Sequence, residues 1–223
     1  MLPQFNNHTL LTTALTHRSA LNEPASGTTS KVSNERLEFL GDAVLELAIT
    51  LFLFDKLPSE PEGMLTAFRS ALVKTETLAE VAAELGLGEK LYLSKGEEAT
   101  GGRTNVSLLA DTTEAVIGAI YLDQGFEAAQ KFVKTNIASK FDEIRTKRLY
   151  KDAKSLLQET VQAQGYSTPH YLVVDEKGPD HQKIYTVKAV IDNKDCGHGQ
   201  GANKQAAQQA AATQALLEFE KKE

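Results

Sequence analysis

The sequence predicts a multidomain chain, in which an all-α domain is followed by a smaller α+β domain with the element order α-β-β-β-α. Between residues 10 and 144, apolar residues recur at helical spacing in long runs, and few segments alternate. After a basic stretch the period changes, and residues 185–191 alternate apolar and polar side chains as a half-buried strand does. We therefore predict domains at 1–146 and 153–222, joined by a linker at 147–152.

Loops divide the predicted helical domain. Residues 23–33 are rich in Ser, Thr, Gly and Pro and predict a loop, and Ser33 or Asn34 is placed to cap the helix that follows. Residues 94–104, with three glycines, predict another loop. Its Gly-Gly-Arg sequence, which ends at Arg103, either brings a guanidinium close to a phosphate or simply connects two helices.

The second domain is predicted to contain five elements. In chain order these are a helix at 153–165, strands at 171–174, 185–191 and around Cys196, and a helix at 202–219. The last helix is rich in alanine, which indicates a face of small residues packed on a sheet.

Three carboxylates follow the predicted loop at spacings that stack them on one helical face. Glu35, Glu38 and Asp42 stand at i, i+3 and i+7. Such close like charges repel each other, and neighbouring apolar side chains disfavour their ionised forms further. A hard divalent cation is the simplest compensation.

A second acidic pair lies in another strongly apolar helix, where Asp111 and Glu114 stand at i and i+3. If the two helices pack together, Glu38 and Asp42 converge with this pair. The resulting site contains only oxygen ligands, which suits Mg²⁺ rather than zinc.

Each acidic group also has an alternative interpretation. Asp111 and Glu114 could merely complement the helix macrodipole, as acidic residues in a first turn do. The acidic residues before Ala43 could form a solvated face beside a core helix. Residues 43–54, however, are apolar nearly all round apart from Glu46, so we expect this helix to be buried and its carboxylates to need partners.

Composition and charge exclude several classes of protein. Cys196 is the only cysteine, so an intramolecular disulfide is impossible and a cytoplasmic location is expected. The N-terminus lacks the pattern of a secretory signal, and the longest apolar run is too short to span a bilayer, so we expect no membrane partner.

The net charge of −6 argues mildly against nucleic-acid binding, although metal-site carboxylates add negative charge that cations offset. From residue 152 onward, eight Lys and Arg stand against ten Asp and Glu, so this part is not basic either. One basic stretch could contact a partner or could be a solvated linker. It contains Arg145, Lys147, Arg148, Lys151 and Lys154.

Two other signals do not support a site. The glycine-rich run 197–201 has the wrong spacing for a dinucleotide loop, so no nucleotide cofactor is expected. The five histidines show no paired ligand spacing, which makes structural zinc improbable, and His17 is expected to pack or hydrogen-bond within the helical domain.

Residues 34–42, Asn-Glu-Arg-Leu-Glu-Phe-Leu-Gly-Asp, resemble the signature of the bacterial ribonuclease III family of Mg²⁺-dependent endonucleases that act on double-stranded RNA. Further motifs resemble that family in the same order, namely Thr16-His-Arg-Ser19, Glu62-Gly63, Gly101-Gly-Arg103 and Leu109-Ala-Asp-Thr-Thr-Glu-Ala115. The resemblance implies that the metal ligands are Glu38, Asp42, Asp111 and Glu114, with Asp42 and Glu114 catalytic and Glu35 and Glu62 accessory acidic groups. It implies Mg²⁺ as the cofactor, with Mn²⁺ as a substitute.

The order of the last five elements resembles a double-stranded-RNA-binding domain. The residues that this resemblance assigns to RNA binding are Gln158, Glu159, His181, Asn203 and Lys204. Such domains read the A-form shape and 2′-hydroxyls rather than the sequence. By the same resemblance, Asn203 stands where a basic residue is usual, so one positive charge is missing.

The resemblance implies an endoribonuclease that leaves 5′-phosphate and 3′-hydroxyl ends in the processing of rRNA precursors, mRNA and other structured RNA. It further implies a homodimer in which Phe39 packs across a two-fold axis, so that two sites cut both strands with a short 3′ overhang. Two alternatives are a non-catalytic RNA-binding protein and a nuclease that acts without help from its C-terminal domain. The acidic residues at all four ligand positions favour the enzyme.

Overall fold

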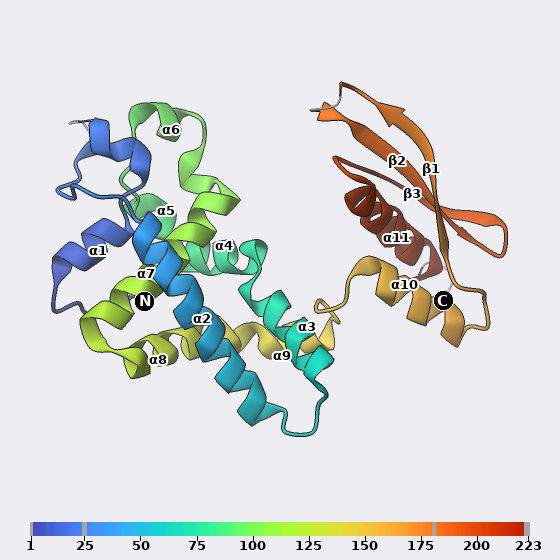
Figure 1. The fold of residues 1–223 in the computed structure, drawn as a ribbon, viewed down its shortest axis with the longest axis horizontal. Helices are drawn as coiled ribbons and strands as arrows, with labels where there is room; N and C mark the ends of the chain where they lie inside the picture. The colour runs from blue at the N-terminus through green and yellow to red at the C-terminus, as the bar shows by residue number, and fades with distance from the viewer. Residues whose placement is uncertain (1, 24–25, 180–181, 221–223) are drawn as a thin grey trace. The chain divides into compact units, whose positions relative to one another are not determined.

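The computed structural model describes residues 2–23, 26–179 and 182–220, and the chain forms two compact units, Met1–Tyr150 and Lys151–Glu223. The first unit is helical (Figure 1). Its elements are α1 (His8–Ala14), η1 (Arg18–Asn22), α2 (Glu35–Lys56), α3 (Glu62–Val73), α4 (Thr75–Glu84), α5 (Leu87–Lys90), α6 (Lys95–Ala99), η3 (Gly102–Thr104), α7 (Val106–Gln124), α8 (Phe126–Asn136), η4 (Ala138–Lys140) and α9 (Phe141–Thr146). The predicted all-α domain is confirmed.

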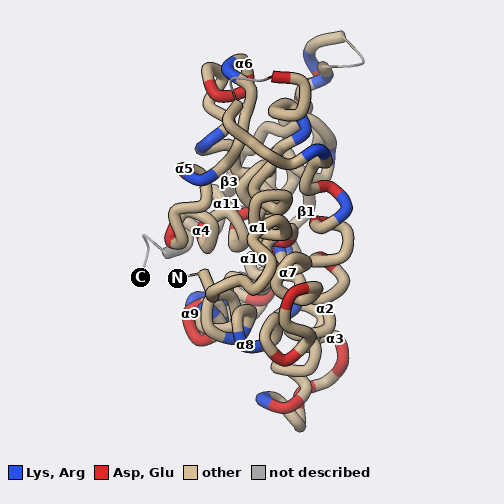
Figure 2. The backbone as a smooth tube through the Cα atoms, turned by 90° about the vertical axis from the view of Figure 1, so that its left-hand side faces the viewer, with Lys and Arg blue, Asp and Glu red and all other residues tan. Residues whose placement is uncertain are grey.

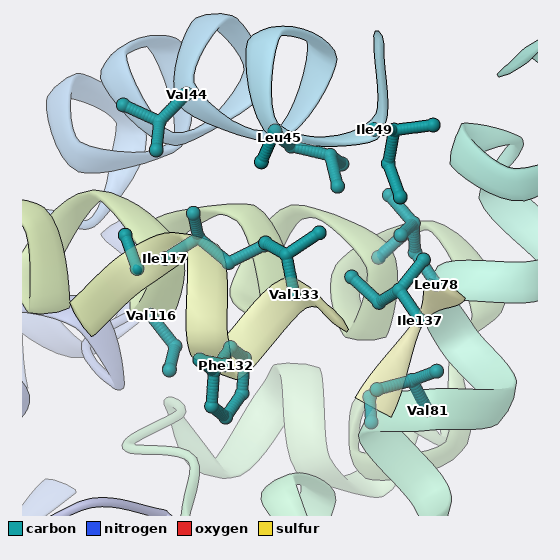
Figure 3. Packing of buried hydrophobic residues seen from close by; sticks show 14 of the residues in the cluster. Val44, Leu45, Ile49, Leu78, Val81, Val116, Ile117, Phe132, Val133 and Ile137 are labelled. Atoms are coloured by element: carbon teal, nitrogen blue, oxygen red, sulfur yellow. The ribbon is translucent and has the colours of Figure 1, made fainter. Parts of the chain in front are cut away.

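The core of the first unit is built around α2 and α7. Leu45 and Ile49 of α2 point into the core, where side chains of α7, α4 and α8 such as Ile117, Leu78 and Val133 complete the packing (Figure 3). Ten residues of α7 are buried, which makes it the central helix of this unit. Burial of apolar side chains, at roughly 25 cal/mol per Å², is the main force that holds these helices together.

Two glycines let α2 and α7 approach unusually closely. A Cβ on Gly41 would lie 1.8 Å from the carbonyl oxygen of Glu114, and one on Gly118 would lie 2.2 Å from the carbonyl oxygen of Leu37. Only glycine fits at both positions, because any side chain would force the helices apart. Glycine is unfavourable inside a helix by about 1 kcal/mol relative to alanine, so its presence here reflects this contact.

Helix α2 is not buried all round, contrary to the prediction for residues 43–54. Phe39, Leu47 and Phe54 are 82%, 50% and 68% exposed. They are eight and seven residues apart, about two helical turns each, so they lie along one side of the helix, away from α7. Because residues of this helix are apolar nearly all round, we predicted that other elements would bury it on every side. Within the described residues, no helix covers the side that carries these three side chains.

The second unit contains a sheet with two helices packed against it. Its elements are α10 (Ala153–Ala163), β1 (His170–Lys177), β2 (Ile184–Ile191), β3 (Lys194–Gly201) and α11 (Lys204–Glu220). The strands pair antiparallel in the order β1-β2-β3, with irregularities after Val173 and after Ala189. The predicted α-β-β-β-α fold is therefore confirmed, although β1 is longer than the predicted 171–174.

The glycines of the run 197–201 serve packing. Those at 197, 199 and 201 are the alternate residues of β3 that face α11, and a Cβ on Gly199 would lie 2.1 Å from the backbone nitrogen of Ala211. Four alanines form the facing side of the helix and are fully buried. They are Ala207, Ala211, Ala212 and Ala215. The alanine-rich sequence thus has the packing role that the sequence predicted.

The junction between the units lies in the basic stretch. Tyr150 belongs to the first unit, since its ring packs on that of Phe68 with the centroids 4.3 Å apart. Lys147 pairs with Glu143 at 2.6 Å, and Lys151 pairs with Glu159 of the second unit. Much of this basic stretch therefore has partners within the chain.

Across the described residues, no helix combines the length and apolar character needed to cross a membrane.

Candidate active site

The closest contact of α2 with α7 brings the predicted carboxylates together. Glu38 and Asp42 flank Gly41 on α2, and the carbonyl group that Gly41 approaches is that of Glu114. Asp111 precedes Glu114 by about one turn of α7. Figure 2 shows acidic residues in red at intervals along α2. The glycine contact thus fixes the spacing between the acidic faces of two helices.

Electrostatic coupling shows that the four carboxylates are neighbours. Burial raises the pKa of Glu38, and the charges of Asp111, Glu35 and Asp42 raise it further. Burial also raises the pKa of Glu114, to about 8, with added repulsion chiefly from Asp42 and Glu38. Acidic side chains on each helix therefore raise the pKa of acidic side chains on the other. A positive charge between the two helices would relieve the repulsion among these carboxylates.

The helix-dipole interpretation of Asp111 and Glu114 is excluded by where α7 begins. The helix starts at Val106, with Asn105 as its N-cap, and has no acidic residue in its first turn. The dipole effect falls off beyond that turn, so it does not account for either group. Burial raises the pKa of Asp111, whereas the charge of His17 lowers it.

A pocket of about 400 Å³ opens beside these carboxylates. Its lining includes Glu35, Glu38, Asp111, His17 and Arg18. Arg18 lies 3.6 Å from Glu35, and His17 Nδ1 shares a 2.9 Å hydrogen bond with the Ser19 hydroxyl. His17 thus hydrogen-bonds within the helical domain, as predicted, and also lies at the edge of the site.

The residue types fit a hard divalent cation, because the neighbouring side chains are carboxylates whose mutual repulsion a cation would offset. Within the described residues, however, no three Asp, Glu, His or Cys side chains are already arranged to hold an ion. The electrostatic coupling brings these carboxylates into one neighbourhood without a preformed coordination sphere.

Two further acidic residues, Glu62 and Glu46, differ in how they relate to the carboxylate cluster. Glu62 begins α3, beyond the C-terminal end of α2, where it accepts a 2.9 Å hydrogen bond from Thr66. Eighteen residues of helix separate Glu38 from Lys56, about 27 Å, so Glu62 does not join the cluster within one protomer. Glu46, which the sequence did not single out, adds to the raised pKa of Glu114 and pairs with Arg69 at 3.0 Å.

Arg103 connects helices rather than pointing at a ligand. Its guanidinium contacts Glu98 at 2.6 Å and the backbone carbonyls of Gly88 and Leu91 at 2.9 and 3.0 Å. Of the two interpretations of the Gly-Gly-Arg sequence, this geometry supports the connector.

Three of the predicted RNA-binding residues of the second unit lie on its two helices. Gln158 and Glu159 are exposed on α10, and Lys204 begins α11. Lys204 lies 3.6 Å from Glu176 of β1. Asn203 has a role that the sequence prediction missed, because its Oδ1 accepts a 2.8 Å hydrogen bond from the backbone N–H of Ala206 and so caps α11. His181 lies outside the described residues.

Both units match known protein families. Residues 7–141 match the family model described as Ribonuclease-III-like, and residues 153–218 match the double-stranded RNA binding motif. The chain is 44% identical over 220 residues to the Ribonuclease 3 of Chloroflexus aggregans, covering 97% of this chain and 93% of that protein. It is 45% identical over 212 residues to the Ribonuclease 3 of Geobacillus kaustophilus, covering 95% and 85%.

A solved structure agrees for the helical unit. The nuclease domain of ribonuclease III from Campylobacter jejuni is 41% identical, covers 62% of this chain and 88% of its own, and superposes with a TM-score of 0.55. A second structure of that nuclease domain, described as flexible in a region involved in dimer formation, is 40% identical, covers 60% and 92%, and gives a TM-score of 0.54.

An acidic helical nuclease domain followed by a double-stranded RNA binding motif defines an endoribonuclease of double-stranded RNA. The chain belongs to the ribonuclease III family.

Proposed function

We propose that the chain hydrolyses double-stranded RNA at the carboxylate cluster of α2 and α7, with Mg²⁺ as its cofactor and Mn²⁺ as a substitute. The observation that carries this proposal is the mutual raising of acidic pKa values across the two helices, up to about 8 at Glu114. A protein gains nothing in stability from assembling like charges, so the cluster is best explained as a cation site.

Four residues hold the metal in this proposal, namely Glu38, Asp42, Asp111 and Glu114. Bound Mg²⁺ supplies water activation and stabilisation of the leaving oxygen in phosphodiester hydrolysis, giving 5′-phosphate and 3′-hydroxyl ends. The glycine contact keeps the two acidic faces in register. Glu35 adds negative charge at the mouth of the pocket, where Arg18 limits its repulsion of phosphate.

The second unit supplies binding to the duplex. Gln158 and Glu159 on α10, and Lys204 at the start of α11, offer hydrogen-bonding groups and a positive charge to grooves and phosphates. The family resemblance assigns His181, which lies outside the described residues, to RNA binding as well. The recognised feature is the shape of A-form RNA, so structured RNAs such as rRNA precursors and mRNA hairpins suit the site. We place this activity in the cytoplasm.

A homodimer covers the exposed side of α2. Phe39, 82% exposed, is the most exposed large apolar residue on this helix, and a pocket of about 510 Å³ lies farther along it. Phe52 and Ala48 of α2 and Val133 of α8 supply apolar lining to that pocket. A second copy of the chain is the occupant that we propose for both features.

Two-fold symmetry relates the two features. Thirteen residues, about 20 Å of helix, separate Phe39 from Phe52, so an axis near Leu45 and Leu47 lets each protomer insert Phe39 into the partner's pocket. The same axis brings the loop that precedes α3 towards the N-terminal end of the partner's α2. Glu62 then serves as an accessory acid of the partner's site, and two sites act on the two strands.

Incubation of the chain with long double-stranded RNA tests the enzymatic proposal. With Mg²⁺ or Mn²⁺, we expect short duplex products with 5′-phosphate ends and short 3′ overhangs. With Ca²⁺, we expect binding without turnover, because the larger ion relaxes the coordination geometry. Cleavage of equal rate in EDTA, or products with 5′-hydroxyl ends, would contradict the proposal.

Phe39→Ala tests the dimer. Sedimentation should show a dimer for the unaltered chain and a shift towards monomer for the variant, because a buried aromatic anchor is lost. Leu217→Ala is the control, since it removes another large apolar side chain, 52% exposed, from the other unit. A dimer of unchanged affinity in the Phe39 variant would rule out this interface.

A further inference from the structure

The described lysines of the second unit differ in what they contact. Lys177 pairs with Asp175 at 2.6 Å, Lys188 with Asp195 at 3.0 Å, and Lys204 with Glu176 at 3.6 Å. Each of these cations is partly neutralised by a carboxylate of its own domain. Lys154 instead donates to a neutral amide, since its Nζ lies 2.7 Å from Gln208 Oε1.

The ammonium group of Lys154 is held in place from two sides. Gln208 holds it from α11, and the ring of Tyr171 on β1 lies beneath it, with Nζ 5.0 Å from the ring centroid. The backbone N–H of Lys154 also donates to Gln209 Oε1 at 3.3 Å. Three elements thus position a half-buried lysine whose long side chain would otherwise be mobile.

Tyr171 does not cancel that charge. Burial and the charge of Asp152 raise its pKa to about 12, so the phenol stays neutral at physiological pH. Among the described residues its buried hydroxyl has no hydrogen-bond partner, which is unusual for a buried polar group. The nearby carboxylate of Asp152 is occupied by Ser155, at 3.1 and 2.8 Å, and by Gln209 at 3.0 Å.

The ammonium group of Lys154 lies close to the N-terminal end of α11. Gln208 follows Lys204 by four residues, so the Lys154 ammonium lies about one helical turn from Lys204 on the same side of α11. Lys154 also lines one pocket, of about 400 Å³, together with Gln158 and Gln205. The pocket therefore joins the surfaces of α10 and α11 to which RNA binding is already assigned.

We propose that Lys154 is a further RNA-binding residue, which contacts a backbone phosphate of the duplex beside the phosphate that Lys204 contacts. In this arrangement α10 supplies a positive charge to the α11 surface, where neutral Gln205 and Gln208 stand. This inference rests on the proposed duplex binding by the second unit. Its ligand is the phosphate backbone, so its contribution is independent of sequence.

Lys154→Gln in the full chain, on a Glu114→Gln background, tests the inference by fluorescence anisotropy with labelled duplex RNA across a salt series. We expect affinity at low salt to fall about two- to fivefold, as for an exposed charge contact. The log-log salt slope should become shallower by somewhat under one unit, and equally so for two unrelated duplex sequences. Lys154→Arg should restore both quantities.

Two further variants separate position from net charge. Lys194→Gln removes the same charge at the start of β3, beside the turn between β2 and β3. In that turn Asp192 accepts a 3.3 Å hydrogen bond from the backbone N–H of Ser167, in the loop that follows α10. Lys194→Gln should leave affinity nearly unchanged. Gln208→Glu keeps Lys154 but pairs it with a carboxylate, so it should lower affinity as Lys154→Gln does.

Thermal unfolding of each variant shows whether the domain is still folded. The inference is overturned if Lys154→Gln, folded as the background chain is, binds with unchanged affinity and slope while Lys204→Ala lowers both. It is also overturned if Lys194→Gln lowers affinity as much as Lys154→Gln, because net charge alone then explains the effect. If the background chain itself fails to bind duplex RNA, the proposed function falls together with this inference.

Discussion

At the scale of single residues, the largest electrostatic cost lies at Glu114. Its pKa is raised from 4.5 to about 8, first by burial and then by neighbouring carboxylates. Below pH 4.5 both the folded and the unfolded chain hold this proton, so it has no effect on stability. As the pH rises towards 8 the unfolded chain releases the proton while the folded chain retains it, and stability falls.

Glu114→Gln should therefore stabilise the metal-free protein, and the gain should grow between pH 4.5 and about 8 and then level off. Thermal unfolding in EDTA at a series of pH values measures this. Mg²⁺ should stabilise the unaltered chain more than the variant, because ions that bind the folded state raise its stability. Glu89→Gln is the control, because Glu89 is an exposed acid that does not contribute to the raised pKa of Glu114. Equal melting temperatures of the variant and the unaltered chain at pH 8 would contradict the account.

Asn203 shows how one residue supports two interpretations. The sequence marked it as a missing phosphate contact, whereas its side chain caps α11 through the Ala206 N–H. Loss of such a cap costs about 1 kcal/mol. Asn203→Lys consequently exchanges a cap for a charge, and its predicted gain in RNA affinity accompanies a less stable second unit.

Asn203→Asp isolates the cap, because the carboxylate still accepts the Ala206 N–H bond. We expect it to melt near the temperature of the unaltered chain, whereas Asn203→Ala and Asn203→Lys should lower stability by about 1 kcal/mol. Urea unfolding of the second unit, followed by circular dichroism, measures the difference. Equal stability of all variants would show that the cap contributes nothing.

At the scale of elements, the site depends on the glycine contact of α2 with α7. Gly41→Ala would put a methyl group 1.8 Å from the carbonyl oxygen of Glu114. We expect it to destabilise the chain by about 3 kcal/mol or more, as severe overpacking does, and to abolish cleavage. Chemical denaturation and a cleavage assay measure both effects.

Gly63→Ala is the matched control, since it also lies in a helix but a Cβ there meets nothing within 4 Å. It should leave stability unchanged or raise it by up to about 1 kcal/mol. If Gly41→Ala behaves like Gly63→Ala, the close approach of α2 and α7 does not hold the site together.

Much of this organisation was predictable from the sequence, because helical and strand periodicities differ. The helical unit, the three strands and the alanine-rich last helix all followed from spacing. The contact at Gly41 and Gly118 was not predicted, since spacing along a chain does not show which helices cross; a glycine inside each of two apolar helices was the available signal. The exposure of Leu47 and Phe54 on α2 was not predicted, because apolar composition does not show which side of a helix other elements cover; only the family resemblance placed Phe39 at an interface.

At the scale of the whole molecule, the two units have separate hydrophobic cores. The first keeps Tyr150, which packs on Phe68, so a truncation must retain this residue. The chain truncated after Tyr150 should stay folded and dimeric and cleave duplex RNA weakly at low salt. Circular dichroism, sedimentation and a cleavage assay check this, and an unfolded or monomeric product would show that the boundary is misplaced.

The central claim is that acids of two helices form one metal-dependent nuclease site, and paired variants test it most directly. Asp42→Asn alters α2 and Glu114→Gln alters α7, each without changing side-chain size. Cleavage of labelled double-stranded RNA should be measured for both variants and the unaltered chain across a Mg²⁺ series, with duplex binding followed in parallel. The account predicts that both variants bind the duplex as dimers and fail to cleave it. Full cleavage by either variant at ordinary Mg²⁺ would contradict it.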